Sequence, residues 1–322
     1  MRIPEILRHA IHSEAARVDR SALARASADI TAAYKAGDFS KPALQSDLHR
    51  LAYALVRMPA TFAANLHVAQ ELRERVPSLT PKSVLDLGAG PGTSMWALAE
   101  VFPSIERFVL IERDAALAGI GNRIAAKSDC PALQRAQWES ADLANSSSWE
   151  HDLIIASYSL GELPLSVATA LVRRCWTAAQ QMLVLIEPGT RRGFDTILNA
   201  RAELIRAGAA LAGPCPHHDE CPMAAVGDWC HFAQRIERTS EHRRIKDGSL
   251  GYEDEKFSYV AASKYDVERR RARILRHPMR FSGHVKLQLC SGPIPEQQTI
   301  TRSQKDRYKI ARDAKWGDVW NF

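Results

Sequence analysis

Residues 1–79 carry apolar positions spaced three and four apart, which is the repeat of helices with one buried side. The repeat is clearest in residues 2–11 and 48–76, and Pro77 and Pro81 then interrupt it. The pattern therefore predicts a helical N-terminal region over residues 1–80.

From residue 82 onward, short apolar runs alternate with longer amphipathic segments. Strands that alternate with helices of ten or more residues imply a parallel sheet covered by helices on both faces. We therefore predict a Rossmann-like, doubly wound α/β core over residues 81–212. Its strands are expected at 83–90, 107–113, 133–140, 152–160 and 181–189, and its helices at 93–102, 114–127, 164–180 and 190–211.

The pattern changes again after this core. Residues 213–232 are rich in Pro, Gly, His and Cys, and we expect a cysteine-rich insertion over 213–256. Two further apolar runs, at 256–263 and 284–290, predict the last strands of the core sheet, with a basic segment between them. The polar tail at 291–322 shows no core pattern.

Composition adds only a little to this picture. Hydrophobic residues make up 46% of the 322 residues and charged residues 25%, and no apolar run approaches the roughly 20 residues that span a bilayer. The charged N-terminus lacks an apolar signal core, so we expect a cytoplasmic monomer without a membrane segment. The net charge of +6 favours a polyanionic partner such as RNA, although it also fits a basic soluble protein without one.

A glycine-rich loop lies between the first predicted strand and its helix. Its pattern is Asp-x-Gly-x-Gly-x-Gly, formed by Asp86, Gly88, Gly90 and Gly92. A dinucleotide fingerprint would place its third glycine where Thr93 stands. The pattern instead resembles motif I of class I methyltransferases, whose ligand is S-adenosylmethionine.

Two acidic residues follow in the order that such a site needs. Glu112 ends the second predicted strand, where a carboxylate can accept hydrogen bonds from both ribose hydroxyls. Asp142 occupies the place where the resemblance puts an adenine-contacting acid. The alternative is an ordinary strand–helix turn with a surface acid, but the ordered combination favours a cofactor site.

Three of the six cysteines, Cys215, Cys221 and Cys230, crowd together beside three histidines, and Cys290 ends a predicted strand. No Cys-x-x-Cys pair is present, so the spacing suits a zinc site and an iron–sulfur cluster equally. A histidine could replace one thiolate in the zinc case. Buried cysteines without any metal remain the third interpretation.

The densest basic stretch contains Arg269, Arg270, Arg271, Arg273 and Arg276. Arginine pairs with phosphates through its planar guanidinium and stacks on bases, so this stretch predicts an RNA contact. A solvated helix face is the alternative.

Several sequence blocks together resemble one family. They are Cys-Pro-His at 215–217, Cys-Pro at 221–222, Asp-Trp-Cys-His-Phe at 228–232, and the segments 156–163, 187–189, 252–259 and 315–318. These blocks resemble the methyltransferase-like proteins of the mitochondrial small ribosomal subunit and their bacterial relatives. The resemblance implies a class I methyltransferase fold, association with small-subunit ribosomal RNA, and a [4Fe–4S] cluster held by Cys215, Cys221, Cys230 and Cys290.

The catalytic residues stay unassigned. Enzymes that methylate amino groups of nucleic acids often carry Asn/Asp-Pro-Pro-aromatic after the fourth strand, where this chain has Ser157-Tyr158-Ser159-Leu160. We expect an S-adenosylmethionine-dependent methyltransferase-like protein that acts on or binds small-subunit ribosomal RNA. The alternatives are a non-catalytic ribosome assembly factor with a retained donor site and structural metal, and a zinc-stabilised ribosome-binding protein.

Overall fold

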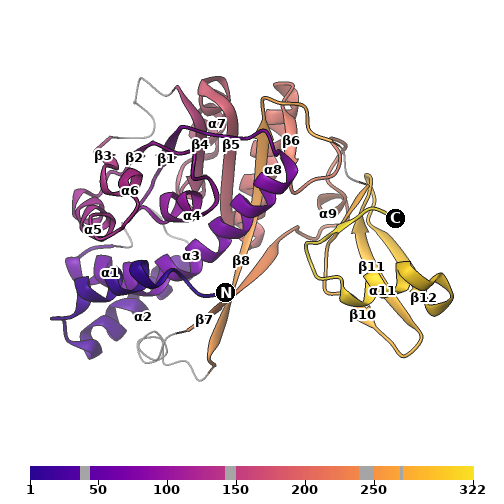
Figure 1. Ribbon diagram of the computed structural model, residues 1–322, viewed down its shortest axis with the longest axis horizontal. Coiled ribbons are helices and arrows are strands. Elements are labelled where there is room, and N and C mark those ends of the chain that lie inside the picture. Colours follow the sequence, from indigo (N-terminus) through magenta and orange to yellow (C-terminus); the bar gives the residue numbers. More distant parts are fainter. Residues whose placement is uncertain (37–43, 142–149, 239–249, 269–270) are drawn as a thin grey trace.

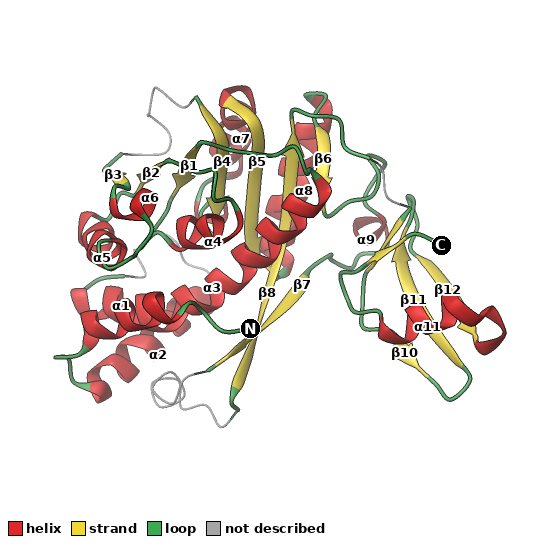
Figure 2. Cartoon of the chain, in the orientation of Figure 1, coloured by secondary structure: helices red, strands yellow, loops and turns green. Residues whose placement is uncertain are grey.

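The computed structural model describes residues 1–36, 44–141, 150–238, 250–268 and 271–322 (Figure 1). Three of the predicted site residues, Asp142, Arg269 and Arg270, lie outside these ranges. A large α/β body carries the N-terminal helices, and a smaller sheet with its own helix follows at the C-terminal end (Figure 2).

The N-terminal region is helical, as its periodicity predicts. It consists of α1 (Glu5–Ala15), α2 (Arg20–Ala36) and α3 (Asp47–Arg75). The Ser46 hydroxyl accepts a hydrogen bond from the His49 amide at 3.2 Å and so caps the start of α3. In the described residues, no helix is both long enough and apolar enough to cross a membrane.

The core is an eight-stranded mixed sheet in which seven strands follow the order β3-β2-β1-β4-β5-β8-β6, with β7 paired to β8. Strands β1 to β5 are parallel, and β8 runs antiparallel between β5 and β6. This is the order of a class I methyltransferase-like α/β fold, so that expectation is confirmed. The strands are β1 (Ser83–Leu87), β2 (Arg107–Ile111), β3 (Gln137–Glu139), β4 (His151–Ser157), β5 (Ala179–Pro188), β6 (Ala210–Gly213), β7 (Phe232–Glu237) and β8 (Tyr252–Ser263).

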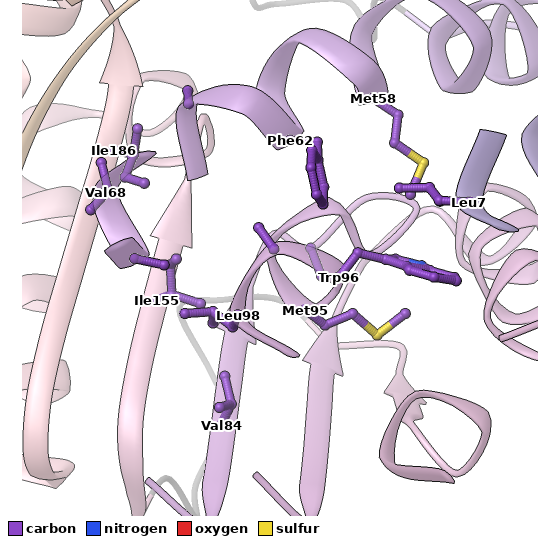
Figure 3. Packing of buried hydrophobic residues seen from close by; sticks show 14 of the residues in the cluster. Leu7, Met58, Phe62, Val68, Val84, Met95, Trp96, Leu98, Ile155 and Ile186 are labelled. Carbon is purple, nitrogen blue, oxygen red and sulfur yellow. The ribbon is translucent and has the colours of Figure 1, made fainter. Parts of the chain in front are cut away.

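Helices cover both faces of this sheet, because its strands are apolar on both sides. In β4, Leu153 and Ile155 pack toward α3 and α4, whereas Ile154 and Ala156 pack toward α7 and α8. Figure 3 shows the first of these layers, with Phe62 of α3 and Trp96 of α4 among its residues. The helices are α4 (Thr93–Val101), α5 (Ala115–Ala125), α6 (Pro131–Gln134), the short η1 (Leu160–Glu162), α7 (Leu165–Ala178) and α8 (Arg191–Arg206).

Two details of the predicted elements are wrong. The helix expected over residues 190–211 ends at Arg206, and its last part becomes β6. The strand expected at 284–290 does form, but it joins a second sheet instead of completing the core sheet. Only β8 of the expected last strands belongs to the core.

The second sheet forms a C-terminal module, which we define as residues 271–322. Its strand order is β10-β11-β9-β13, with β12 on the other edge of β11. The tail after residue 290 is therefore structured, contrary to its patternless sequence, because single residues such as Ile300, Ala311 and Trp320 fill the core of the module. Its elements are β9 (Ala272–Ile274), β10 (Met279–Arg280), β11 (His284–Cys290), β12 (Glu296–Thr301), η2 (Arg302–Gln304), α11 (Lys305–Asp313) and β13 (Val319–Trp320).

Candidate functional site

The glycine loop joins the end of β1 to the start of α4. Gly88, Gly90 and Gly92 have φ angles of 70°, 56° and 81°, in the left-handed region that disfavours side chains. A Cβ at Gly92 would also stand 2.8 Å from Met95 and 3.0 Å from Trp138. The three glycines are therefore required by the backbone path, which leaves the loop without side chains at these positions.

Asp86 lies at the start of this loop and is 1% exposed. Within the described part of the chain, neither of its carboxylate oxygens makes a hydrogen bond of ordinary geometry, although the Ser94 side chain favours the ionised form. Burial outweighs Ser94 and raises the pKa of Asp86 to about 7. A buried carboxyl group with so little hydrogen bonding fits a site that receives a donor or a cation from a ligand.

Glu112 follows β2 and turns back onto the glycine loop. One carboxylate oxygen accepts a hydrogen bond from the Gly90 amide at 2.9 Å, and the other accepts from the Asp114 amide at 2.8 Å. Burial raises its pKa, while these two amides oppose the rise. Glu112 and the glycine loop, which the sequence places in successive strand ends, are therefore in direct contact. Each carboxylate oxygen keeps a further lone pair that can accept from a ligand hydroxyl.

The segment after β4 contains a polar network that the sequence analysis missed. Tyr158 has a φ of 61°, which is uncommon for a residue with a side chain. Its hydroxyl donates to Glu255 of β8 at 2.9 Å, and Arg57 of α3 pairs with the same carboxylate at 2.8 and 3.2 Å. No short-range pattern could reveal it, because its members come from three distant segments.

Glu187 ends β5 beside this network and is 2% exposed. Its carboxylate accepts a hydrogen bond from the Leu160 amide at 2.9 Å, and burial raises its pKa to about 7. A Cβ at Gly161 would stand 2.7 Å from the Glu187 carboxylate, so a larger residue there would have to displace that carboxylate.

The structure brings the four predicted cysteines to one place. Cys215, Cys221, Cys230 and Cys290 line a common cavity of about 40 Å³ between α8, β8 and the C-terminal module. Because a single water needs roughly 10–15 Å³ by the same measure, the cavity has room for a body larger than one atom. Burial raises the pKa of the Cys230 thiol, and the other three cysteines raise it further.

Two arginines hold the cavity walls in place. Arg201 of α8 donates to the Cys215 sulfur at 3.3 Å and to the carbonyl oxygens of His217 and Asp219 at 3.0 and 2.7 Å. Arg273 of β9 donates to the carbonyl oxygen of Pro214 at 2.9 Å. The sequence signal for these roles is absent, because both arginines lie outside the cysteine segment.

The shared cavity is not by itself a metal site. Among the described residues, no group of three or more His, Cys, Asp or Glu side chains has the arrangement that holds a metal ion. The metal site expected from the sequence therefore stays a prediction, for zinc and for an iron–sulfur cluster alike.

The predicted RNA-binding arginines divide into different roles. Arg273 is 3% exposed and pairs with Glu71 of α3, so it cannot reach a phosphate and its assignment is wrong. Arg276 donates to the Asp228 carboxylate at 2.7 Å and to the Trp229 carbonyl at 3.1 Å, which ties it to the loop before Cys230. Of the five, Arg271 is exposed in the described chain.

Comparison with known proteins gives a match over most of the chain. The family model described as mitochondrial small ribosomal subunit Rsm22 matches residues 47–321. The human mitochondrial ribosome assembly protein METTL17 is 27% identical over 289 residues, and the mitochondrial Rsm22-cox11 tandem protein 2 of Schizosaccharomyces pombe is 25% identical over 339 residues. The alignments cover 84% and 85% of this chain, which spans 62% and 43% of those proteins.

Among solved structures, the magnesium protoporphyrin IX methyltransferase of Synechocystis PCC 6803 with bound S-adenosylmethionine is similar, with a TM-score of 0.44 and 14% identity. The similarity covers 78% of this chain and 99% of that enzyme. A similarity of this size does not bear on substrate or chemistry.

The comparisons overturn one expectation. The matched family and both relatives are described as mitochondrial, so the expectation of a cytoplasmic protein is wrong. The sequence argument relied on the charged N-terminus and its acidic residues, which do not report the compartment.

Proposed function

Because the chain belongs to the family of the mitochondrial small ribosomal subunit protein Rsm22, we propose that it is a methyltransferase-like assembly factor of the small ribosomal subunit that binds S-adenosylmethionine and ribosomal RNA. The observation that carries this proposal is the family match over 47–321. That range includes the glycine loop, the cysteine cavity and nearly all of the C-terminal module.

The glycine loop and its acids are the proposed donor site. The backbone at Gly88, Gly90 and Gly92 would lie against the methionyl part, Glu112 would accept from the ribose hydroxyls, and Asp142 would contact the adenine. The buried Asp86 carboxyl group supports this assignment, since a bound cationic ligand favours its ionised form. When bound, S-adenosylmethionine supplies an electrophilic methyl group on a sulfonium.

The finer proposal for the cysteines is a [4Fe–4S] cluster held by Cys215, Cys221, Cys230 and Cys290. Four thiols in one cavity supply the ligand set of such a cluster. The cavity that the four cysteines line is larger than the space that one water needs. Its role here would be to fasten the C-terminal module to the core.

Assembly without methyl transfer is the form of the proposal that the site favours. The Tyr158 hydroxyl after β4 is occupied by Glu255, and burial raises its pKa well above the ordinary value. A neutral phenol that already donates its proton is a poor general base at pH 7. Methyl transfer to ribosomal RNA is the second candidate, supported by the donor-site geometry.

Of the RNA-contacting arginines expected from the sequence, Arg271 keeps an exposed position and is proposed to meet phosphate together with Arg269 and Arg270. Arg273 is removed from this set, because its guanidinium is buried and paired with Glu71. Arg276 stays a proposed RNA contact, because its side chain is 27% exposed beside Asp228.

The donor site is tested by calorimetric titration with S-adenosylmethionine. Glu112→Ala should weaken binding about tenfold or more, because both ribose hydrogen bonds lose their acceptor. Glu106→Gln, at the opposite end of β2 in an exposed ion pair with Lys82, is the matched control and should bind normally. Failure of the wild-type chain to bind would remove the donor site.

Assembly and catalysis are separated with purified small ribosomal subunits. The chain should co-sediment with subunits or their precursors, and radiolabelled methyl groups should stay off the RNA. Transfer of label would favour the enzymatic candidate, while absence of co-sedimentation would contradict the assembly role.

The cluster is tested on protein purified without oxygen. Cys221→Ser and Cys290→Ser should both lose iron, sulfide and the broad visible absorption of a cluster. Cys175→Ser is the control, since Cys175 is buried in α7 away from the cavity. A colourless wild-type protein with stoichiometric zinc would reject the cluster.

A further inference from the structure

The C-terminal module has one sheet face that its helix leaves uncovered. Val285, Leu287 and Leu289 of β11 belong to the core cluster that also contains Ala311 of α11. Because side chains alternate along a strand, His284, Lys286 and Gln288 point to the opposite side of the sheet. These three are half-exposed, so this outer face meets solvent.

Cross-strand neighbours extend the outer face. Lys286 stands opposite Met279 on one side and Thr299 on the other, Gln288 stands opposite Gln297, and His284 stands opposite Thr301. Among these described strand positions none is acidic. The nearest acid, Glu296, pairs with Leu289 and therefore lies on the other side, where Ser291 and Gln298 donate to its carboxylate.

An exposed aromatic side chain borders this face. Phe281 is 49% exposed and stacks on His284, with ring centroids 4.5 Å apart and planes 13° from parallel. Its amide donates to the His284 carbonyl at 2.9 Å, so a tight turn holds the pair together. One face of the ring is thus supported by the protein.

Two cations stand close to this aromatic pair. The Lys286 ammonium is 5.8 Å from the centre of the Phe281 ring. Arg302 is exposed, and its amide donates to the carbonyl of Gly283 in the same turn at 3.1 Å. The turn therefore combines a supported aromatic ring with a nearby ammonium group, and the backbone of the exposed Arg302 is hydrogen-bonded to it.

We propose that this outer face, formed by Phe281, His284, Lys286, Gln288, Gln297 and Thr299, binds unpaired RNA nucleotides. A base would stack on Phe281, Lys286 and Arg302 would meet the backbone phosphates, and the amide and hydroxyl side chains would reach base edges. The proposal rests on the RNA-binding role proposed above and assigns it a surface that the basic stretch at 269–276 does not include.

The chemistry selects single strands over other partners. A duplex keeps its bases stacked inside, so it offers no free base to Phe281. An acidic protein could pair with Lys286 and Arg302, but its carboxylates would leave the exposed face of the Phe281 ring without a planar group stacked on it. A base with a phosphate on each side matches both features.

The test measures binding of a fluorescein-labelled, twelve-nucleotide oligoadenylate to the full chain by anisotropy. Phe281→Ala should weaken binding about tenfold, the loss of one base stack, whereas Phe281→Trp should retain it. Lys286→Met should lower the slope of log affinity against log salt by about 1. Ile294→Ala is the matched control, because Ile294 is 71% exposed in the same module and lies outside the face.

The outcomes separate this surface from the broader function. Unchanged affinity in Phe281→Ala, an equal loss in Ile294→Ala, or equal competition by duplex RNA would overturn the proposed RNA-binding role of the outer face. If the chain still co-sediments with small subunits in that case, the assembly proposal stands without an RNA contact at this face. The proposal for the outer face would also fail if the wild-type chain bound subunits through protein contacts alone and did not bind oligoadenylate.

Discussion

At the scale of single residues, Asp86 and Glu187 are carboxyl groups that the fold removes from water. Both have a pKa raised by burial to about 7, but their surroundings differ. Glu187 accepts an amide hydrogen bond from Leu160, whereas Asp86 makes no hydrogen bond of ordinary geometry in the described chain and has the Ser94 side chain nearby. Asp86 therefore carries the clearer energetic cost of ionisation.

This cost predicts how stability depends on pH. The folded-state pKa of Asp86 lies above its ordinary value of 3.8, so the native state binds the extra proton between about pH 4 and pH 7 and stability falls as pH rises through that range. Asp86→Asn should flatten this fall and be about 1–3 kcal/mol more stable at pH 8. Urea unfolding at pH 5 to 8 measures it.

The control for this prediction has the opposite sign. Asp152 accepts hydrogen bonds from the Lys82 and Ser83 amides, which hold its pKa below the ordinary value despite partial burial. Asp152→Asn should therefore lose stability above pH 4. If the free energy of unfolding changed with pH by the same amount in the wild type and in Asp86→Asn, Asp86 would not be the source of the fall in stability.

At the scale of elements, the C-terminal module is closed by a very short strand. β13 has two residues, and it pairs with β9. Its Trp320 is 1% exposed and donates from the indole nitrogen to Gln298 of β12 at 3.1 Å. One large side chain thus joins β13, at an edge of the sheet, to β12, which is not its neighbour.

Removing that side chain should open the module. Trp320→Ala is expected to destabilise by about 3–5 kcal/mol, because it leaves a large cavity and removes one hydrogen bond to Gln298. Phe322→Ala, two residues later and 48% exposed, should change stability by less than about 0.5 kcal/mol. Hydrogen exchange in β11 and β12 measures the difference, and equal protection in the two variants would contradict it.

At the scale of the whole molecule, one buried ion pair connects three parts. Arg273 pairs with Glu71 of α3 and donates to the carbonyls of Pro214, before the cysteines, and Gly317, near the C-terminus. Burial alone would raise the pKa of Glu71, but the Arg273 guanidinium outweighs it and holds that pKa low. The core, the cavity and the module therefore depend on a single guanidinium.

Breaking this pair should affect all three parts together. Arg273→Met is expected to destabilise by about 3–5 kcal/mol, because Glu71 is left buried and charged. The double variant Glu71→Met with Arg273→Met should regain part of that loss, since no charge then remains unpaired. Urea unfolding of the single and double variants tests it; a double variant no more stable than Arg273→Met would argue against an uncompensated charge.

The sequence by itself determined most of the elements and the path of the glycine loop. Apolar periodicity indicates which side of each element is buried, so it predicted the N-terminal helices and the alternating strands and helices of the core. The positive φ angles of the glycines at 88, 90 and 92 follow from a local motif. Glu112 could be predicted as well, because consecutive parallel strands end at the same edge of the sheet.

Only the tertiary structure decided which sheet β11 joins, which arginines are buried, and that Cys290 meets the other three cysteines. Periodicity shows that a strand has a buried side but does not identify its neighbour. Arg273 belongs to a run of arginines in sequence, yet its partner Glu71 lies 202 residues away. Such pairings depend on contacts between distant segments, and those exist only once the chain has folded.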